Sequence, residues 1–177
     1  MKTDRFFLRE IEPNDHENVF IGLSDPAIVK YYGVNFDSLE ATEEQMLWFK
    51  NLKKNNKGIW WAICDISTQK FLGAGGLNDI HSEHKKAEVG LWLLKENWGQ
   101  GIMAAVMPLI LNYAFDKLLL HRIEGHVDSQ NIKCKRALKK LDFKYEGTMI
   151  DSEIKNDRFV SIDIYAFLKS HRKTNFT

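Results

Sequence analysis

A short segment with two glycines, Trp98-Gly99-Gln100-Gly101-Ile102, separates a strand pattern from a long apolar run. Residues 87–94 before it are mostly apolar, follow a charged turn and predict a strand. Residues 102–120 after it predict a buried helix, with a kink at Pro108. Glycines let successive backbone N–H groups turn toward one point, and a helix start adds unpaired donors and a positive dipole end. The segment therefore fits an anion site, such as one for a pyrophosphate, and equally a tight turn.

The remaining chain predicts further strands and helices on both sides of this segment. Strands are expected at residues 6–11, 59–66, 71–77, 87–94, 122–127, 143–150 and 159–168, and helices at 13–23, 42–52, 102–120 and 131–141. Three consecutive strands make a meander, and the later strands follow helix crossovers. We therefore expect an α+β fold with a mixed sheet and helices on its faces. A chain of 177 residues fits one domain, residues 1–177.

Charge and composition argue against several classes of protein. The 25 basic and 24 acidic side chains nearly cancel, so neither nucleic acid nor a membrane surface is an expected partner. No apolar stretch approaches the roughly 20 residues of a membrane helix. Two cysteines, Cys64 and Cys134, and the lack of an apolar leader favour the cytoplasm. His81 and His84 have no ligand partners at metal-binding spacing, so no metal is expected.

The glycines also match the fingerprint of a dinucleotide-binding fold. Gly99-x-Gly101-x-x-Ala104 has the fingerprint spacing, and Glu124 lies about 20 residues further on, where an acid that binds ribose would stand. In that fold, however, the glycines follow a first parallel strand directly, and several further βαβ units come after them. Here a predicted meander comes first and the remaining chain is too short, which argues against a nicotinamide dinucleotide.

Four segments together resemble the GCN5-related N-acetyltransferase (GNAT) superfamily, in its branch of ribosomal-protein alanine N-acetyltransferases. They are Leu8-Arg9, residues 87–93, residues 98–103, and Asn131-x-x-Cys134 followed by residues 137–143. The resemblance covers nearly the whole chain. It implies a mostly antiparallel sheet of six to seven strands, splayed between the fourth and fifth strands, and an enzyme that moves an acetyl group from acetyl-coenzyme A to a primary amine.

The resemblance also implies which residues hold acetyl-coenzyme A. The backbone of the fourth strand would pair with the pantetheine arm, the glycine segment would wrap the pyrophosphate, and the next helix would reach the cofactor. The residues concerned are Leu91, Trp92, Leu93, Trp98, Gly99, Gln100, Gly101, Ile102, Met103 and Asn131. Trp98 and Met103 depart from the family pattern, which has Arg or Gln and then Gly or Ala at these places. Backbone contacts tolerate both departures if the turn keeps its shape.

Three side chains are candidates for the chemistry. Cys134 stands where relatives have a serine that is credited with protonating the leaving thiolate, and a thiol can do the same. Alternatively, Cys134 is a small apolar residue that is buried in the core. An acetyl-cysteine intermediate is less favoured than direct attack by the amine, because no histidine is near Cys134 in sequence. Tyr145 could donate the proton instead. Glu88 could steer or deprotonate the amine, or simply be a charged residue on the open side of a strand.

The acceptor is expected to be a primary amine, either a protein N-terminus or a small molecule. A free α-amine has a pKa of about 8 against about 10.4 for lysine, so it needs less help from a base. Because other relatives act on amino sugars, polyamines or antibiotics, those acceptors remain alternatives. A different alternative is a non-catalytic sensor that binds acyl-coenzyme A. The groove for the acceptor is expected from residues 31–49, with Tyr31 and Tyr32 in its lining, and 151–158; the protein is expected to be a monomer or homodimer.

Overall fold

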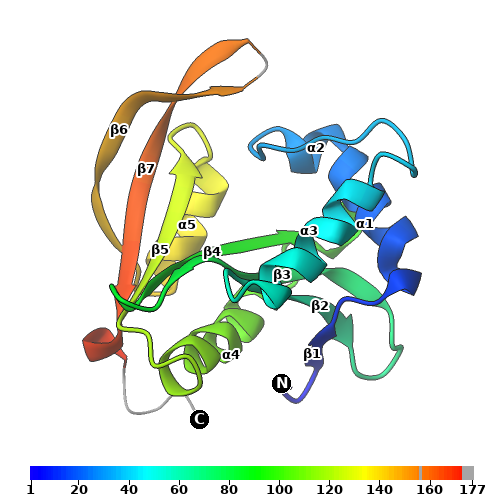
Figure 1. Ribbon diagram of the computed structural model, residues 1–177, viewed down its shortest axis with the longest axis horizontal. Helices are drawn as coiled ribbons and strands as arrows, with labels where there is room; N and C mark the ends of the chain where they lie inside the picture. Colours follow the sequence, from blue (N-terminus) through cyan, green and yellow to red (C-terminus); the bar gives the residue numbers. More distant parts are fainter. Residues whose placement is uncertain (156, 173–177) are drawn as a thin grey trace.

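The structure is a computed structural model that describes residues 1–155 and 157–172. Seven strands form one sheet in the order β1-β2-β3-β4-β5-β7-β6 (Figure 1). The strands are β1 Phe6–Glu10, β2 Ile59–Asp65, β3 Phe71–His81, β4 Lys86–Leu93, β5 Arg122–Asp128, β6 Lys144–Lys155 and β7 Arg158–Leu168. The α-helices are α1 His16–Ser24, α2 Pro26–Val29, α3 Glu43–Lys54, α4 Ile102–Asp116 and α5 Ile132–Lys140, with 3-10 turns at Pro13–Asp15, Lys95–Asn97 and Lys169–His171.

The pairing of β4 with β5 is parallel and short. It covers only Lys86–Glu88 against Arg122–Glu124, whereas every other neighbouring pair in the sheet is antiparallel. Beyond Glu88, β4 stays paired with β3 as far as Leu93, and β5 stays paired with β7 as far as Asp128. The two strands therefore separate into a wedge-shaped gap, which Figure 1 shows between β4 and β5 and which we call the splay.

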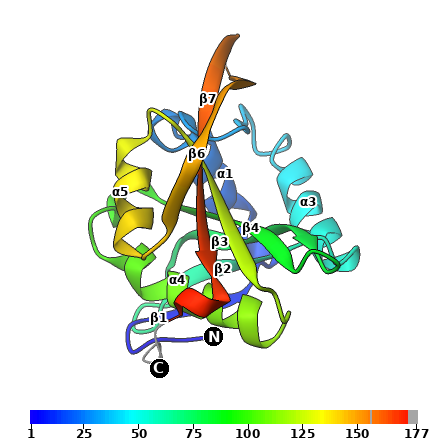
Figure 2. The same ribbon diagram turned by 90° about the vertical axis from the view of Figure 1, so that its left-hand side faces the viewer.

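Each face of the sheet has its own apolar core, because strand residues alternate between faces. On one face, Ala87, Val89 and Ile123 pack with the apolar side of α4 and with Leu138 of α5. On the other, Trp60 and Trp92 pack with residues of α1, α2 and α3, among them Phe49. Figure 2 shows α5 and α3 on opposite sides of the sheet. No helix in the described part of the chain is both long and apolar enough to cross a membrane.

The expected fold class is confirmed, including the splay between the fourth and fifth strands, while several element bounds differ. Strands β3 and β6 are longer than expected, and the short helix α2 was not predicted. Helix α4 runs through Pro108 but ends at Asp116 rather than near residue 120. It ends there because Leu119 is left-handed (φ 55°), and the N–H of Leu120 turns back to the carbonyl of Ala114.

Candidate active site

The glycine turn before α4 presents backbone donors to open space. Gly99 and Gly101 have φ of 76° and 75°, a conformation that favours glycine, and nothing lies within 4 Å of where a Cβ would stand at either. The first helical hydrogen bond runs from the N–H of Ala105 to the carbonyl of Gly101. The N–H groups of residues 102–104 therefore precede the helical ladder, at the positive end of the dipole. This geometry fits a pyrophosphate.

Cationic and aromatic side chains border the glycine turn. The indole Nε1 of Trp98 donates to the carbonyl oxygen of Leu93 over 2.9 Å, and the Lys133 ammonium lies 5.4 Å from the centre of the Trp98 ring. The Gln100 amide donates to the carbonyl of Glu96 over 3.0 Å and accepts from Arg5 over 3.4 Å. Arg5 and Lys133 had no signal in the sequence, because strand β1 and helix α5 meet the turn only in the folded chain.

The edge of β4 in the splay carries backbone donors. The N–H of Leu94 donates to Leu72 of β3 over 2.9 Å. Because donors alternate along an antiparallel strand, the N–H groups of Leu91 and Leu93 point the other way, into the splay, and that of Trp92 points to β3. The hydroxyl oxygen of Tyr32 meets the backbone N–H of Leu91, and burial raises the pKa of this tyrosine. Of the two N–H groups that point into the splay, that of Leu91 is therefore engaged by Tyr32, and that of Leu93 is the better candidate for contact with a ligand.

Cys134 lies in the first turn of α5, where its N–H donates to the side-chain oxygen of Asn131 over 3.1 Å. Asn131 is therefore the N-cap of α5, besides being a predicted cofactor contact. Burial raises the pKa of the Cys134 thiol to about 11. Cys134 and Tyr32 are close enough to affect each other's charge, so α5 and the segment after α2 contribute side chains to the same place.

The structure places Tyr145 in a different polar network. Its hydroxyl lies 2.7 Å from the hydroxyl of Thr148, which donates to Asp163 over 2.6 Å. Lys135 of α5 donates to the same carboxylate over 2.9 Å. Tyr145 thus reaches the α5 side of β6 and β7, whereas the charge of Cys134 acts on the pKa of Tyr32 and of Tyr165. Proton donation by Tyr145 stays a prediction.

On the opposite face of the sheet, where β4 and β5 begin to separate, charged side chains surround a hollow of about 220 Å³. Arg122, Glu124 and His126 share this face because they alternate along β5, and Ile123 between them is buried on the other face. Glu88 of β4 is the register partner of Glu124. The hollow is lined by Asp79, His81, Lys86, Ala87, Glu88, Glu124 and His126. Glu88, a predicted site residue, thus lies within an ionisable cluster.

The imidazole of His126 lies between two carboxylates. Its Nδ1 is 3.5 Å from Glu88 and its Nε2 is 3.6 Å from Glu124. Burial raises the pKa of Glu88; His126 opposes the rise, and Asp79 and Glu153 add to it. Burial would also raise the pKa of Glu124, but its bonds to Arg122 (2.7 Å) and Lys86 outweigh burial and lower it. Glu124 therefore stays ionised, while Glu88 holds a proton more readily than an exposed carboxylate.

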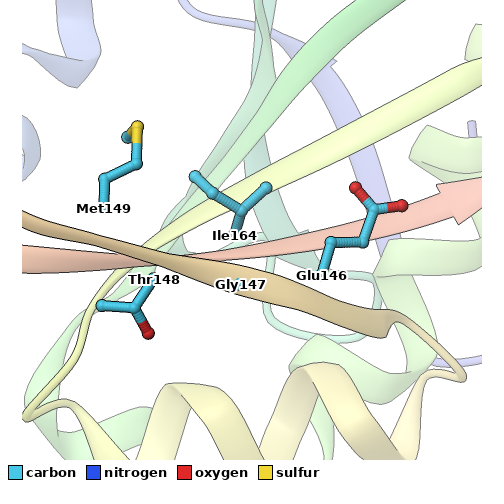
Figure 3. Close-up of a pocket in the computed structure, with 5 residues that line it drawn as sticks. All are labelled: Glu146, Gly147, Thr148, Met149 and Ile164. Atoms are coloured by element: carbon cyan, nitrogen blue, oxygen red, sulfur yellow. The ribbon is translucent and has the colours of Figure 1, made fainter.

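A second hollow, of about 280 Å³, lies on β6 and β7 and is lined by Glu146, Gly147, Thr148, Met149 and Ile164 (Figure 3). Ile164 is the register partner of His126 on β5 and of Gly147 on β6, so the apolar lining continues the row of the ionisable cluster. In Figure 3 Met149, Ile164 and Glu146 lie on one side of the hairpin and Thr148 on the other. The two hollows thus give one face with an acidic part and an apolar part.

A hydrogen bond joins the two segments from which the acceptor groove was predicted. The Lys155 ammonium near the end of β6 donates to the carbonyl oxygen of Tyr31 over 3.4 Å and pairs with Glu153 over 3.2 Å. Asn156, within the predicted 151–158 segment, lies outside the described residues. No sequence motif indicated His126 as a site residue, because its position beside Glu88 depends on the register of β5 against β4.

Comparison with known proteins agrees with this geometry. Residues 5–144 match the family described as acetyltransferase (GNAT) domain. A Bacillus subtilis (strain 168) protein named "uncharacterized N-acetyltransferase YoaA" is 29% identical over 170 residues, which cover 96% of each chain. The crystal structure of spermidine N-acetyltransferase from Vibrio cholerae in complex with CoA and spermine has a TM-score of 0.85 at 22% identity, covering 96% of this chain and 98% of that one. The structure of RimL, a ribosomal L7/L12 alpha-N-protein acetyltransferase in complex with coenzyme A, has a TM-score of 0.84 at 20% identity, covering 96% of this chain and 97% of that one.

Proposed function

The chain belongs to the acetyltransferase (GNAT) domain family and transfers the acetyl group of acetyl-coenzyme A to an amine, and we propose that the two substrates meet in the splay from opposite faces of the sheet. The single observation that carries this proposal is the position of the splay. The glycine turn and Cys134 belong to elements on the α4–α5 side, while Glu88 and His126 face the α1–α3 side.

On the α4–α5 side, the proposed role of the chain is to hold the acyl donor and to stabilise the charge that develops on it. Acetyl-coenzyme A supplies a thioester whose carbonyl carbon is the electrophile. The turn at residues 98–103 offers backbone donors to the pyrophosphate, and the N–H group of Leu93 is the proposed donor to a carbonyl oxygen that gains charge, since that of Leu91 already meets Tyr32. The protonated thiol of Cys134 is the proposed proton source for the leaving sulfur.

On the α1–α3 side, the proposed role is to draw in an ammonium group and to remove its proton. Glu88, Asp79 and Glu153 place negative charge around the point where β4 and β5 separate. The neutral amine then attacks the thioester directly while both substrates are bound. Because Cys134 belongs to the cofactor side and its thiol resists ionisation, an acetyl-cysteine intermediate is disfavoured.

The proposed acceptor is a small or N-terminal primary amine. The acidic cluster favours an acceptor with positive charge beyond the reacting amine, and Met149 and Ile164 suit an aliphatic portion next to it. A polyamine meets both conditions, which makes it the second candidate beside a protein N-terminus. Two of the structural relatives act on these two classes, spermidine and a ribosomal protein. The two unpaired cysteines also suit a reducing cytoplasm, and the protein is proposed to be a monomer or homodimer.

Release of free thiol from acetyl-coenzyme A tests this function. The panel holds spermidine, spermine, a peptide with a free N-terminus and blocked lysine, the reverse peptide, and an amino sugar. We expect turnover with spermidine or with the N-terminal peptide, and slower turnover with the lysine peptide. Tight binding of acetyl-coenzyme A without turnover on any amine would favour a sensor of acyl-coenzyme A and overturn the catalytic proposal.

A further inference from the structure

We propose that His126 is the base that takes the proton from the acceptor ammonium, with Glu88 and Glu124 holding its imidazole on either side. This inference rests on the proposed function and adds a catalytic residue to it. The ring contributes two nitrogens, and each faces a carboxylate: Nδ1 lies 3.5 Å from Glu88 and Nε2 lies 3.6 Å from Glu124. His126 is about one-third exposed, so an incoming substrate can reach it.

The two carboxylates are held to different extents, so the two nitrogens of the His126 ring have different surroundings. Glu124 is fixed by Arg122 over 2.7 Å and by Lys86 over 3.4 Å, and Arg122 is itself held by Glu146 of β6. Glu88 is the register partner of Glu124 and has His126 as its ion-pair partner in the described structure. A fixed carboxylate at Nε2 orients the ring, as carboxylates do for catalytic histidines. The Nδ1 atom of the ring then faces Glu88, and a substrate ammonium can approach the ring from this side.

Charge around the ring suits a proton that arrives and then leaves. A neutral imidazole carries an N–H on only one of its two nitrogens, whereas the imidazolium formed on proton uptake carries one on each and adds a positive charge between the two carboxylates. The other ionisable groups that face this cluster come from β3, β4, β5, β6 and the segment after α2; they are Asp79, His81, Lys86, Arg122, Glu146, Glu153 and Tyr32. Asp79 and Glu153 add negative charge near Glu88, and the positive charge of Lys86 and Arg122 is already paired with Glu124.

The proton balance of the reaction needs such a group. The acceptor enters as an ammonium with three N–H bonds, and the amide product keeps one of them. As the N–C bond forms and the C–S bond breaks, the thiol of Cys134 gives its proton to the sulfur of coenzyme A and recovers one of the two protons that leave the nitrogen. The other goes to His126 and from there to solvent through the exposed part of the ring.

Steady-state kinetics of His126→Gln test the role, with His84→Gln as the matched control on the turn between β3 and β4. We expect kcat to fall about 100-fold, in the range for loss of a general base, with KM for acetyl-coenzyme A unchanged. The rise of kcat/KM with pH should be lost or displaced. The defect should shrink with 2,2,2-trifluoroethylamine, an acceptor that enters largely unprotonated, and a merely structural role would not show that dependence.

Two further results keep the inference open to refutation. Glu124→Gln leaves the histidine in place but releases its ring, so we expect a smaller loss of kcat, about 5- to 20-fold, with the same dependence on the acceptor. Equal kcat for wild type and His126→Gln on spermidine, or a defect that is the same for both acceptors, would overturn the role of His126 while leaving acetyl transfer intact. A wild-type protein that acetylates no amine would instead overturn the proposed function.

Discussion

The indole Nε1 of Trp98 donates a 2.9 Å hydrogen bond to the carbonyl oxygen of Leu93, which joins the end of β4 to the glycine turn. The same ring lies under the Lys133 ammonium of α5, so one side chain connects the three elements that surround the cofactor side of the splay. Family members with arginine or glutamine at this place cannot form the same indole contact. The tryptophan thus fixes the spacing between the strand edge and the pyrophosphate turn.

Replacing Trp98 by phenylalanine should loosen this connection without removing the ring beneath Lys133. The loss of one hydrogen bond, worth about 0.5–1.5 kcal/mol, should raise KM for acetyl-coenzyme A by about 2- to 12-fold and leave kcat within twofold. Trp48→Phe is the control, because Trp48 is similarly exposed on α3, on the other face of the sheet. An equal change in KM in both variants would contradict the assigned role of Trp98.

Gly101→Glu should abolish the rise in melting temperature that acetyl-coenzyme A produces. The added carboxylate would stand at the helix start, in space that is open in the structure and that the pyrophosphate requires. Gly101→Asn is the matched control, since asparagine tolerates the left-handed φ of 75° and carries no charge; it should keep most of the shift. A normal ligand-induced shift in a folded Gly101→Glu protein would remove the turn from the cofactor site.

Cys134 should react slowly with iodoacetamide. Burial raises its pKa from 9.0 to about 11, so near pH 8 it should form about 100-fold less thiolate than an ordinary cysteine. Labelling should accelerate as the pH rises toward 11, because only the thiolate is nucleophilic. The measurement is the pH dependence of labelling in a Cys64→Ala background, followed by mass spectrometry. Rapid labelling at pH 7 would show that the thiol is already ionised and would exclude it as a proton donor.

Cys134→Ala should lower kcat more than it weakens binding of acetyl-coenzyme A, by about 10- to 100-fold, since it removes the proposed proton donor. Cys134→Ser should keep most of the activity, because a hydroxyl also carries a proton at neutral pH. Cofactor binding is followed by calorimetry and turnover by thiol release. Equal activity in all three proteins would leave Cys134 with a packing role only, and an acetyl group trapped on its sulfur would favour the covalent route.

Asp163→Asn should destabilise the fold at pH 7 by about 1–3 kcal/mol, because hydrogen bonds to a charged group are lost. Burial alone would raise the pKa of Asp163, but bonds from Thr148 and Lys135 outweigh it and hold the pKa below its usual value. This stabilisation is present above the unfolded pKa of about 3.9 and is lost as the pH falls through the folded pKa. The difference in urea midpoint should therefore shrink between pH 5 and pH 2, and the exposed Asp4→Asn should show no comparable change.

The conformation of the glycine turn was easier to predict from the sequence than the arrangement of side chains around Glu88. Gly99 and Gly101 could be recognised from local sequence, because a segment of five residues indicates both their left-handed conformation and the start of the helix. Glu88 was found from its place in a strand next to that signature. His126 was missed because it depends on which residues of β4 and β5 are paired, and a strand register is a tertiary property.

Element bounds were least predictable where tertiary pairing overrides local preference. The polar residues 78–81 and 151–155 have low strand propensity, yet they belong to β3 and β6 because a neighbouring strand supplies their hydrogen bonds. The three leucines at 118–120 predicted more helix, but Leu119 turns left-handed and Leu120 is buried in the core. Tyr32 was expected in a groove lining, and no local pattern indicated that its hydroxyl meets the backbone of Leu91.

In the proposed arrangement the sheet divides binding of the acyl donor and of the acceptor between its two faces, and this division has a consequence for how the family can diversify. Substitutions in the segment after α2 or in the β6–β7 hairpin alter what meets Glu88 and His126 while leaving the glycine turn at residues 98–103 untouched. Acceptor preference can therefore drift by exchange of surface segments on one side, under no constraint from the nucleotide on the other. At the narrow passage between β4 and β5, substitutions must suit both substrates at once, since a molecule that joined the acceptor to coenzyme A would have to pass through it.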